Sequence, residues 1–231
     1  MSGVGVTNRT SLLRQPLLAL LLAILLALFT VSTVQAQKRV PAGNNTAGFS
    51  FATGSVDAAG RLVSPGEPII SYRLDIAMLA NIDDRPTMDV YGDGRVEVHY
   101  PMYMKRAGDF QMRLDEEELV ELIRSLSANG VLEFDDRKVK KSIRDKKKQS
   151  RAKGRLHAIS DAAVSVIDVR LDEYQKNSSA SPVKKFHKQF KWTNIEHDAR
   201  RYPKERDIVD ANQSVQRLRS LMKDLRLEKR S

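Results

Sequence analysis

The sequence predicts an α+β protein in which an antiparallel sheet has two helices packed on one face. Three observations lead to this fold class. Segments 69–78 and 163–171 alternate apolar and polar residues, as half-buried strands do. Asp93-Gly94 lies between two strand-like runs, which is typical of a hairpin. Segments 119–126 and 215–225 carry apolar residues at the three- and four-residue spacing of an amphipathic helix.

The first 36 residues have the layout of a secretory signal peptide. Arg9 and Arg14 precede an apolar run, Leu17 to Val31, and Val34-Gln35-Ala36 offers the small side chains of a cleavage site. We therefore expect cleavage after Ala36 and an exported chain, periplasmic or extracellular. The alternative keeps the segment as a membrane anchor, although its 15-residue run is shorter than the about 20 residues of a spanning helix.

Composition narrows the chemistry of the mature chain. The sequence has no cysteine, which excludes disulfides, thiol catalysis and thiolate metal sites and fits a bacterial envelope protein. The net charge of +10 is concentrated in one place: residues 137–155 hold eleven Lys or Arg and one acid, Asp145. The formal charges of the rest of the mature chain add up to about −2.

The predicted order of elements begins after a flexible N-terminal linker, residues 37–68, which is rich in Gly, Ala, Ser, Asn and Pro. A single α+β domain, 69–231, follows, interrupted by a basic loop at 137–155. Its first helix opens at Asp115, where Glu118 completes a capping box, and ends at Asn129-Gly130.

The second half repeats the order of strands and then a helix. Strand 163–171 is followed by a turn at 177–182 and by a strand with Phe186, Phe190 and Trp192 on one face. Asp210 can cap the last helix. The halves 87–130 and 160–227 are thus similar in layout, and a diverged duplication is one interpretation of them. The three aromatic residues are most simply core, and an exposed ligand-binding face is the alternative.

Several of these motifs together resemble a group of known proteins. They are Val90 to Val96 with the Asp-Gly-Arg turn, Arg113-Leu114-Asp115 before the helix, Ser160 to Ala163, and Tyr202-Pro203. In this pattern the chain resembles uncharacterised secreted or periplasmic bacterial proteins. The resemblance implies an α+β fold and no assigned activity, so it gives no functional residue.

The basic loop is the sharpest candidate site. We expect it to bind an anionic partner, such as an envelope polymer or a protein, through Lys146, Lys147, Lys148, Arg151, Lys153 and Arg155. The alternative is a solvated connection whose like charges repel one another. The loop has no aromatic residue for base stacking, so nucleic acid is not expected, and a membrane partner follows only if the N-terminal segment is retained.

Other chemistry finds little support in the sequence. No nucleophile elbow or phosphate-binding glycine motif occurs, and we expect no cofactor or metal. Asp89-x-Tyr91-x-Asp93-Gly94 lacks oxygen ligands that a calcium loop needs. Among the acids, Asp83-Asp84 and Asp135-Asp136 read as solvated turn residues.

Three functional hypotheses follow. The first is a non-enzymatic exported binding protein, which contacts its partner through the basic loop or the sheet face opposite the helices. The second is an envelope enzyme or metal-binding protein that uses histidines from non-adjacent strands; His99, His157, His187, His197 and Asp161 are its candidates. The third is a structural envelope protein held by an uncleaved N-terminal segment.

Overall fold

The computed structural model describes residues 37–41, 49–55, 66–76, 85–154 and 163–230. Residues Ala36–Ser231 form one compact unit. The expected signal segment, 1–36, lies outside the described residues. Within the described residues, no helix is long and apolar enough to cross a bilayer.

The part of the chain that the structure describes contains nine strands and four helices, and its sheet is antiparallel, which confirms the α+β class. The strands are β1 (Gln37–Pro41), β2 (Ser50–Ser55), β3 (Ile70–Ile76), β4 (Thr87–Val90), β5 (Arg95–Tyr100), β6 (Gly108–Arg113), β7 (Ala163–Gln175), β8 (Val183–Thr193) and β9 (Glu228–Lys229). The helices are α2 (Glu116–Ala128), α3 (Asp136–Ala152), α4 (Ile195–Arg201) and α5 (Arg206–Met222). The sequence predicted α2 and α5, and the structure adds α3 and α4. The expected cap of the last helix is wrong, because α5 begins at Arg206 and Asp210 lies inside it.

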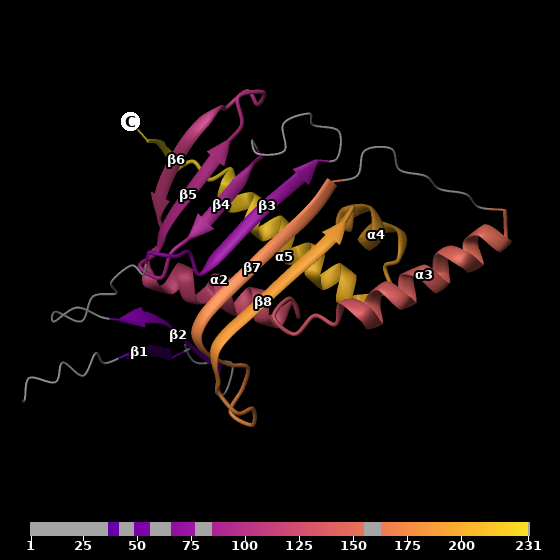
Figure 1. Cartoon of the computed structure of the whole chain (residues 1–231), viewed down its shortest axis with the longest axis horizontal. Helices are drawn as coiled ribbons and strands as arrows, with labels where there is room; N and C mark the ends of the chain where they lie inside the picture. Colours follow the sequence, from indigo (N-terminus) through magenta and orange to yellow (C-terminus); the bar gives the residue numbers. More distant parts are fainter. Residues whose placement is uncertain (1–36, 42–48, 56–65, 77–84, 155–162, 231) are drawn as a thin grey trace, which may run out of the picture. The chain divides into compact units, whose positions relative to one another are not determined.

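The sheet is organised around β7, its longest strand (Figure 1). The strand order is β1-β2-β7-β3-β4-β5-β6-β9, and β8 also pairs with β7. Along β7, the residues from Val164 to Tyr174 pair with β8. On β7 as well, the residues from Ala163 to Val169 pair with β3, and those from Glu173 to Gln175 pair with β2. Because β8 overlaps with both of the others, β2 and β3 must share the opposite edge of β7.

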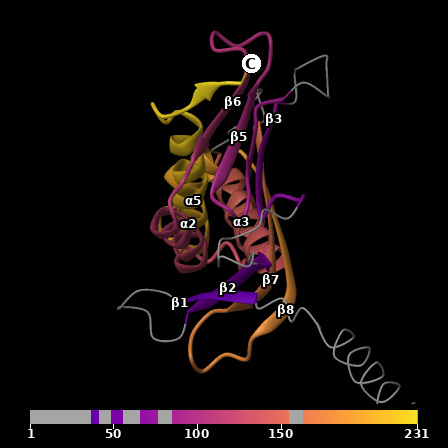
Figure 2. The same cartoon turned by 90° about the vertical axis from the view of Figure 1, so that its left-hand side faces the viewer.

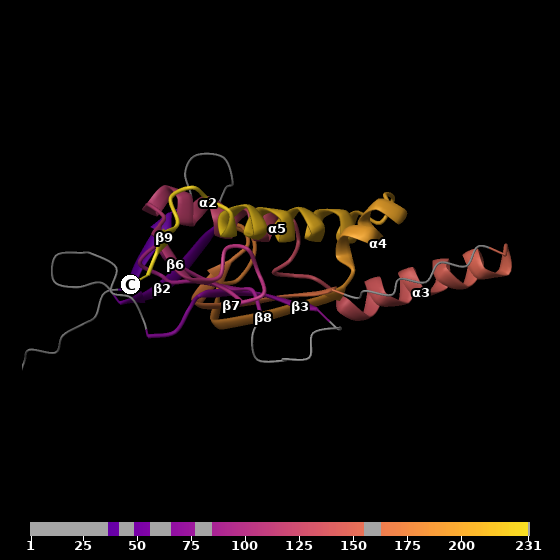
Figure 3. The same cartoon turned by 90° about the horizontal axis from the view of Figure 1, so that it is seen from above.

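The core lies between the sheet and the helices α2 and α5, which Figures 2 and 3 show on the same side of it. Tyr72 of β3 accepts a hydrogen bond from Arg219 Nε of α5 at 2.9 Å, and the hydroxyl of Tyr100 donates to the carbonyl of Met222. The fully buried side chains include Tyr72, Met88, Ile167 and Phe190 from the strands and Leu122, Ile123, Leu126, Ile208, Val215 and Leu218 from the helices.

Two local predictions are confirmed in detail. Asp115 Oδ1 accepts a hydrogen bond from the Glu118 amide at 2.8 Å, and Glu118 Oε2 accepts one from the Asp115 amide at 3.0 Å, which is the capping box at the start of α2. At the β4–β5 turn, Gly94 has φ +85°, and a Cβ there would lie 2.3 Å from the Leu114 carbonyl oxygen. Only glycine fits this turn.

The structure corrects the prediction of a flexible linker at 37–68 where it describes the two strands β1 and β2, while 42–48 and 56–65 lie outside the described residues. β1 and β2 belong to the sheet, and β2 pairs with β7 through Ser50 and Gln175, Phe51 and Tyr174, and Ala52 and Glu173. Phe51 is 1% exposed. The partner strand lies more than 120 residues further along the chain, so the local pattern of β2 carries little sign of its pairing.

The prediction of a basic loop at 137–155 is also wrong, because residues 136–152 form helix α3. Asp135, which the sequence suggested was a solvated turn acid, is its N-cap and accepts hydrogen bonds from the amides of Arg137 and Lys138, each at 3.0 Å. Val139 and Ile143, one turn apart, are its two buried residues, and they fix the helix to the body of the protein.

We predict that Phe51→Ala destabilises the whole domain, because the ring is buried in the shared core and its loss leaves a cavity. The expected loss of unfolding free energy is about 3–5 kcal/mol, measured by urea denaturation. Val183→Ala, at a side chain that is 50% exposed, is the control and should cost much less. Equal effects of the two variants would mean that the segment around β2 is a linker after all.

Candidate anion-binding groove

Helix α3 is attached to the domain by a small apolar contact and by acids from the α4–α5 region. Ser142 donates a hydrogen bond to Glu205 Oε2 at 2.9 Å, and Lys146 pairs with Oε1 of the same carboxylate. Lys138 lies 3.8 Å from Asp207. Most of the other α3 side chains are exposed, so one long face of the helix meets solvent.

A groove of about 560 Å³ lies between α3, the end of β8 and α4. Of the described residues that line it, six are cationic: Lys140, Arg144, Lys147, Lys148 and Arg151 from α3, and Lys191 from β8. The carboxylate among its lining residues is Asp198 of α4. This excess of positive charge around one concave surface creates a field that attracts anions.

Trp192 and Asp198 form the inner wall of the groove. The Trp192 indole Nε1 donates to Asp198 Oδ2 at 3.1 Å, and Lys140 Nζ lies 5.8 Å from the centroid of the indole ring. Asp198 is 3% exposed, and its other oxygen lies 3.5 Å from Lys147 Nζ and 3.7 Å from His197 Nδ1. The buried carboxylate is therefore already surrounded by donors and opposes an incoming anion less than a free acid would.

The predicted anion-binding residues divide into three groups. Lys147, Lys148 and Arg151 line the groove. Lys146 is instead turned to Glu205, and Lys153 is exposed just beyond the helix. Arg155 lies outside the described residues.

Sequence reasoning missed the contribution of β8 and the N-terminal half of α3. Lys140, Arg144, Lys191 and Trp192 also line the groove, and Trp192, which is 5% exposed, is an aromatic residue of the kind that residues 137–155 lack. The alternation along β8 placed Trp192 on a packed face. Its ring packs edge-on against Phe134, two residues before α3, with the ring centroids 5.8 Å apart.

The described histidines, which the second hypothesis would bring together, do not share a site. His99, His187 and His197 lie on β5, β8 and α4, and each is beside the carboxylate of an aspartate. Three strands separate β5 from β8, which corresponds to about 19 Å at the usual strand spacing. Among the described residues, no group of three His, Cys, Asp or Glu is arranged to hold a metal ion. His157 and Asp161 lie outside those residues.

The other acids noted in the sequence have structural contacts. Asp89 accepts a hydrogen bond from the Ser71 hydroxyl at 2.6 Å, and Asp93 Oδ1 accepts one from the Arg95 amide at 3.1 Å inside the β4–β5 turn. The turn thus accounts for the Asp-Gly motif. Asp83 and Asp84 lie outside the described residues.

The chain was compared with models of known protein families, with curated proteins and with solved structures, and nothing matches in any of the three. The similarity to uncharacterised exported bacterial proteins therefore stays a prediction from the sequence motifs. No relative supplies a functional residue, and the groove is interpreted from its own chemistry.

The attachment of α3 should weaken at acid pH. The hydrogen bond from Lys146, with a second from Ser142, lowers the pKa of Glu205 below its ordinary value. A carboxylate with a lowered pKa in the folded state stabilises the fold above its unfolded pKa of about 4.5, and this contribution is lost as the pH falls through the lower folded value.

We therefore predict that Glu205→Gln lowers stability at neutral pH and reduces the further loss on acidification. The measurement is urea unfolding at about pH 7 and about pH 3. The control is Glu228→Gln, at an exposed carboxylate on β9. If the Glu205 variant keeps the full pH dependence of the wild type, the pairing with Lys146 contributes nothing to stability.

Proposed function

We propose that this chain is an exported, non-enzymatic protein that binds an anionic polymer of the cell envelope in the groove between α3 and β8. The observation that carries this proposal is the gathering of six cationic side chains around one groove whose carboxylate is already bonded to Trp192. Such a surface draws in anions over a long range and releases counterions when they bind.

A linear ligand with several charges fits this surface better than a single small anion. Lys140 and Arg151 are eleven residues apart on α3, which is about 16 Å at the helical rise. The cations of the groove therefore form a line along the helix. One phosphate or carboxylate would reach only a part of that line, whereas a polymer of acidic units would contact most of it.

Insertion into a membrane is less consistent with α3. Its two large apolar side chains, Val139 and Ile143, are buried against the domain, and its exposed face is charged or polar. A helix that lies in a membrane interface needs an apolar face to enter the lipid. Attraction by charge alone is what this helix offers.

Binding is also a better account than catalysis for the described residues. The three described histidines lie apart, and the acids beside them do not converge on a common cavity. The location outside the cytoplasm is supported by the arrangement of charged, apolar and small residues at 1–36.

The groove is tested by replacing Arg144, Lys148 and Arg151 together with Gln. These side chains are exposed, and Gln keeps a good helix propensity, so the fold should survive. At roughly 1 kcal/mol for each cation near an anionic surface, we expect binding to heparin or to long-chain polyphosphate to weaken about tenfold to a hundredfold. Fluorescence titration suits this experiment, because Trp192 is the only tryptophan in the chain.

The matched control replaces three exposed lysines elsewhere, Lys105, Lys204 and Lys223, with Gln. It removes the same charge and should leave binding nearly unchanged. An equal loss in both triple variants would show that net charge, and not the groove, holds the polymer, and the proposed site would be wrong.

Export makes a separate prediction. When the full-length chain is expressed in a bacterial host, mass spectrometry of the envelope fraction should find a mature N-terminus at Gln37. Processing at this site follows from the small side chains of Val34-Gln35-Ala36. Recovery of the unprocessed chain from the cytosol would contradict the assignment.

A further inference from the structure

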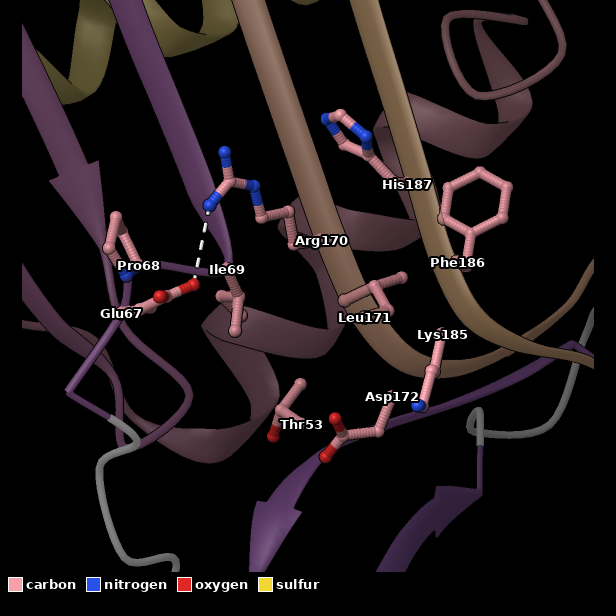
Figure 4. Close-up of a pocket in the computed structure, with 10 residues that line it drawn as sticks. All are labelled: Thr53, Glu67, Pro68, Ile69, Arg170, Leu171, Asp172, Lys185, Phe186 and His187. Atoms are coloured by element: carbon pink, nitrogen blue, oxygen red, sulfur yellow. Dashed lines mark hydrogen bonds and ion pairs between the residues drawn. The ribbon is translucent and has the colours of Figure 1, made fainter.

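A second pocket lies where β2 and β3 share one edge of β7. β3 pairs with β7 up to Val169, and β2 pairs from Glu173 onward, so residues 170–172 lie between the two strands. The Arg170 amide donates to the Ile69 carbonyl at 2.8 Å, at the boundary with β3. A pocket of about 400 Å³, here termed the notch pocket, opens beside this gap (Figure 4).

The notch pocket has an apolar part provided by neighbouring strands. Ile69 and Leu171 are 4% and 3% exposed, and the ring of Phe186 is half-buried. Pro68 completes this lining. A pocket of this size with apolar walls and a few polar groups is typical of small-molecule sites.

The rim of the pocket carries charges of both signs in a defined arrangement. Arg170 of β7 lies opposite His187 of β8 in the strand register, and Asp172 and Lys185 come two residues further along their strands. Arg170 and His187 thus form one row across the two strands and Asp172 and Lys185 a second row, and the two rows are about 7 Å apart. Figure 4 shows the side chains of Asp172 and Lys185 together at one end of the pocket, with Arg170 and His187 at the other.

The two rows differ in how they are held. Asp168 accepts a hydrogen bond from Arg170 Nε at 3.0 Å and lies 3.0 Å from His187 Nε2, and Arg170 Nη1 also pairs with Glu67 at 3.3 Å (Figure 4). Burial alone would raise the pKa of Asp168, but the contacts with His187 and Arg170 outweigh it and lower the pKa. In contrast, Asp172 and Lys185 make no hydrogen bond or ion pair with another described residue, so both charges are available to a ligand.

Two independent features beside this pocket are unfavourable for the stability of the fold. Lys185 has φ +52°, a left-handed conformation that is rare for a residue with a side chain, and it lies inside a strand. Thr53 is 2% exposed, and its hydroxyl oxygen has no hydrogen-bond partner among the described residues. Strained backbone and unsatisfied buried polar groups are features that often accompany a binding site.

We propose that the notch pocket binds a free amino acid with an apolar side chain. Asp172 takes the ammonium group and Lys185 takes the carboxylate, while Arg170 and His187, already paired with carboxylates of the protein, stand at the other end of the pocket. The apolar side chain of the ligand lies against Ile69 and Leu171. The rim balances Arg170 and Lys185 against Glu67 and Asp172, in contrast to the strongly cationic groove of α3. A zwitterion matches this balance, and the proposal is independent of polymer binding.

The test is calorimetric titration of the full chain with L-leucine. Glycine lacks the apolar side chain and N-acetyl-L-leucinamide lacks both charges, so each should bind at least tenfold more weakly than L-leucine. Asp172→Asn should weaken L-leucine binding at least tenfold, whereas Asp145→Asn, at an exposed acid on α3, should leave it unchanged. Heparin binding of the Asp172 variant should equal that of the wild type.

Two further variants separate binding from folding. Thr53→Val replaces an unpaired hydroxyl with a methyl group, and Lys185→Gly relieves the left-handed backbone. Both should keep or raise the midpoint of thermal unfolding, and Lys185→Gly should also weaken L-leucine binding, because it removes the cation that takes the carboxylate. Lys184→Gly, at a neighbouring exposed lysine, should lower the midpoint and keep binding. The proposal is overturned if wild type does not bind L-leucine, if glycine binds equally well, or if Asp172→Asn binds as the wild type does.

Discussion

The antiparallel pairing of β7 is the constraint on which both candidate sites depend. β8 occupies one edge of β7, and β3 and β2 divide the other, which leaves the gap at 170–172 that opens into the notch pocket. On the helix-facing side of β8, the ring of Phe190 stands edge-on to Phe134 at 4.9 Å, and Trp192 does so at 5.8 Å. Phe134 directly precedes the cap of α3. Aromatic packing on the sheet therefore places the start of the basic helix, and the buried Val139 and Ile143 hold the turns that follow.

Sequence reasoning succeeded where the determinants of a structure are local. The capping box of Asp115 and Glu118, the glycine at position 94 and the alternation along β7 each depend on residues a few positions apart. These signals fix backbone conformation and the buried face without knowledge of partners. Lys147, Lys148 and Arg151 were found for the same reason, since charge density is a property of the sequence itself.

The predictions that failed concern segments whose structure depends on contacts with distant parts of the chain. β2 is a strand because Phe51 is buried and β7 offers its edge, and neither fact is visible in a short segment that contains glycine and serine. Residues 137–155 looked like a repelling loop because eleven cations dominate the segment. The weaker signals for a helix were Asp135 as a cap and the pair Val139 and Ile143, four residues apart. Tertiary contacts to Glu205 and Asp198 then offset the repulsion.

The repulsion between the cations of α3 raises the question of why so many of them are clustered on one helix. Like charges at the i, i+4 spacing destabilise α3 by about 1–2 kcal/mol in total. The four pairs are Arg137–Lys141, Lys140–Arg144, Arg144–Lys148 and Lys147–Arg151. Lysines elsewhere on the surface would keep the protein soluble without this cost, so solubility alone is a poor reason for the clustering. A polymer of negative charge bound along the groove would remove the repulsion at the three pairs whose members line it, Lys140–Arg144, Arg144–Lys148 and Lys147–Arg151. Part of its binding free energy would then come from the helix itself, which couples occupation of the groove to the stability of α3.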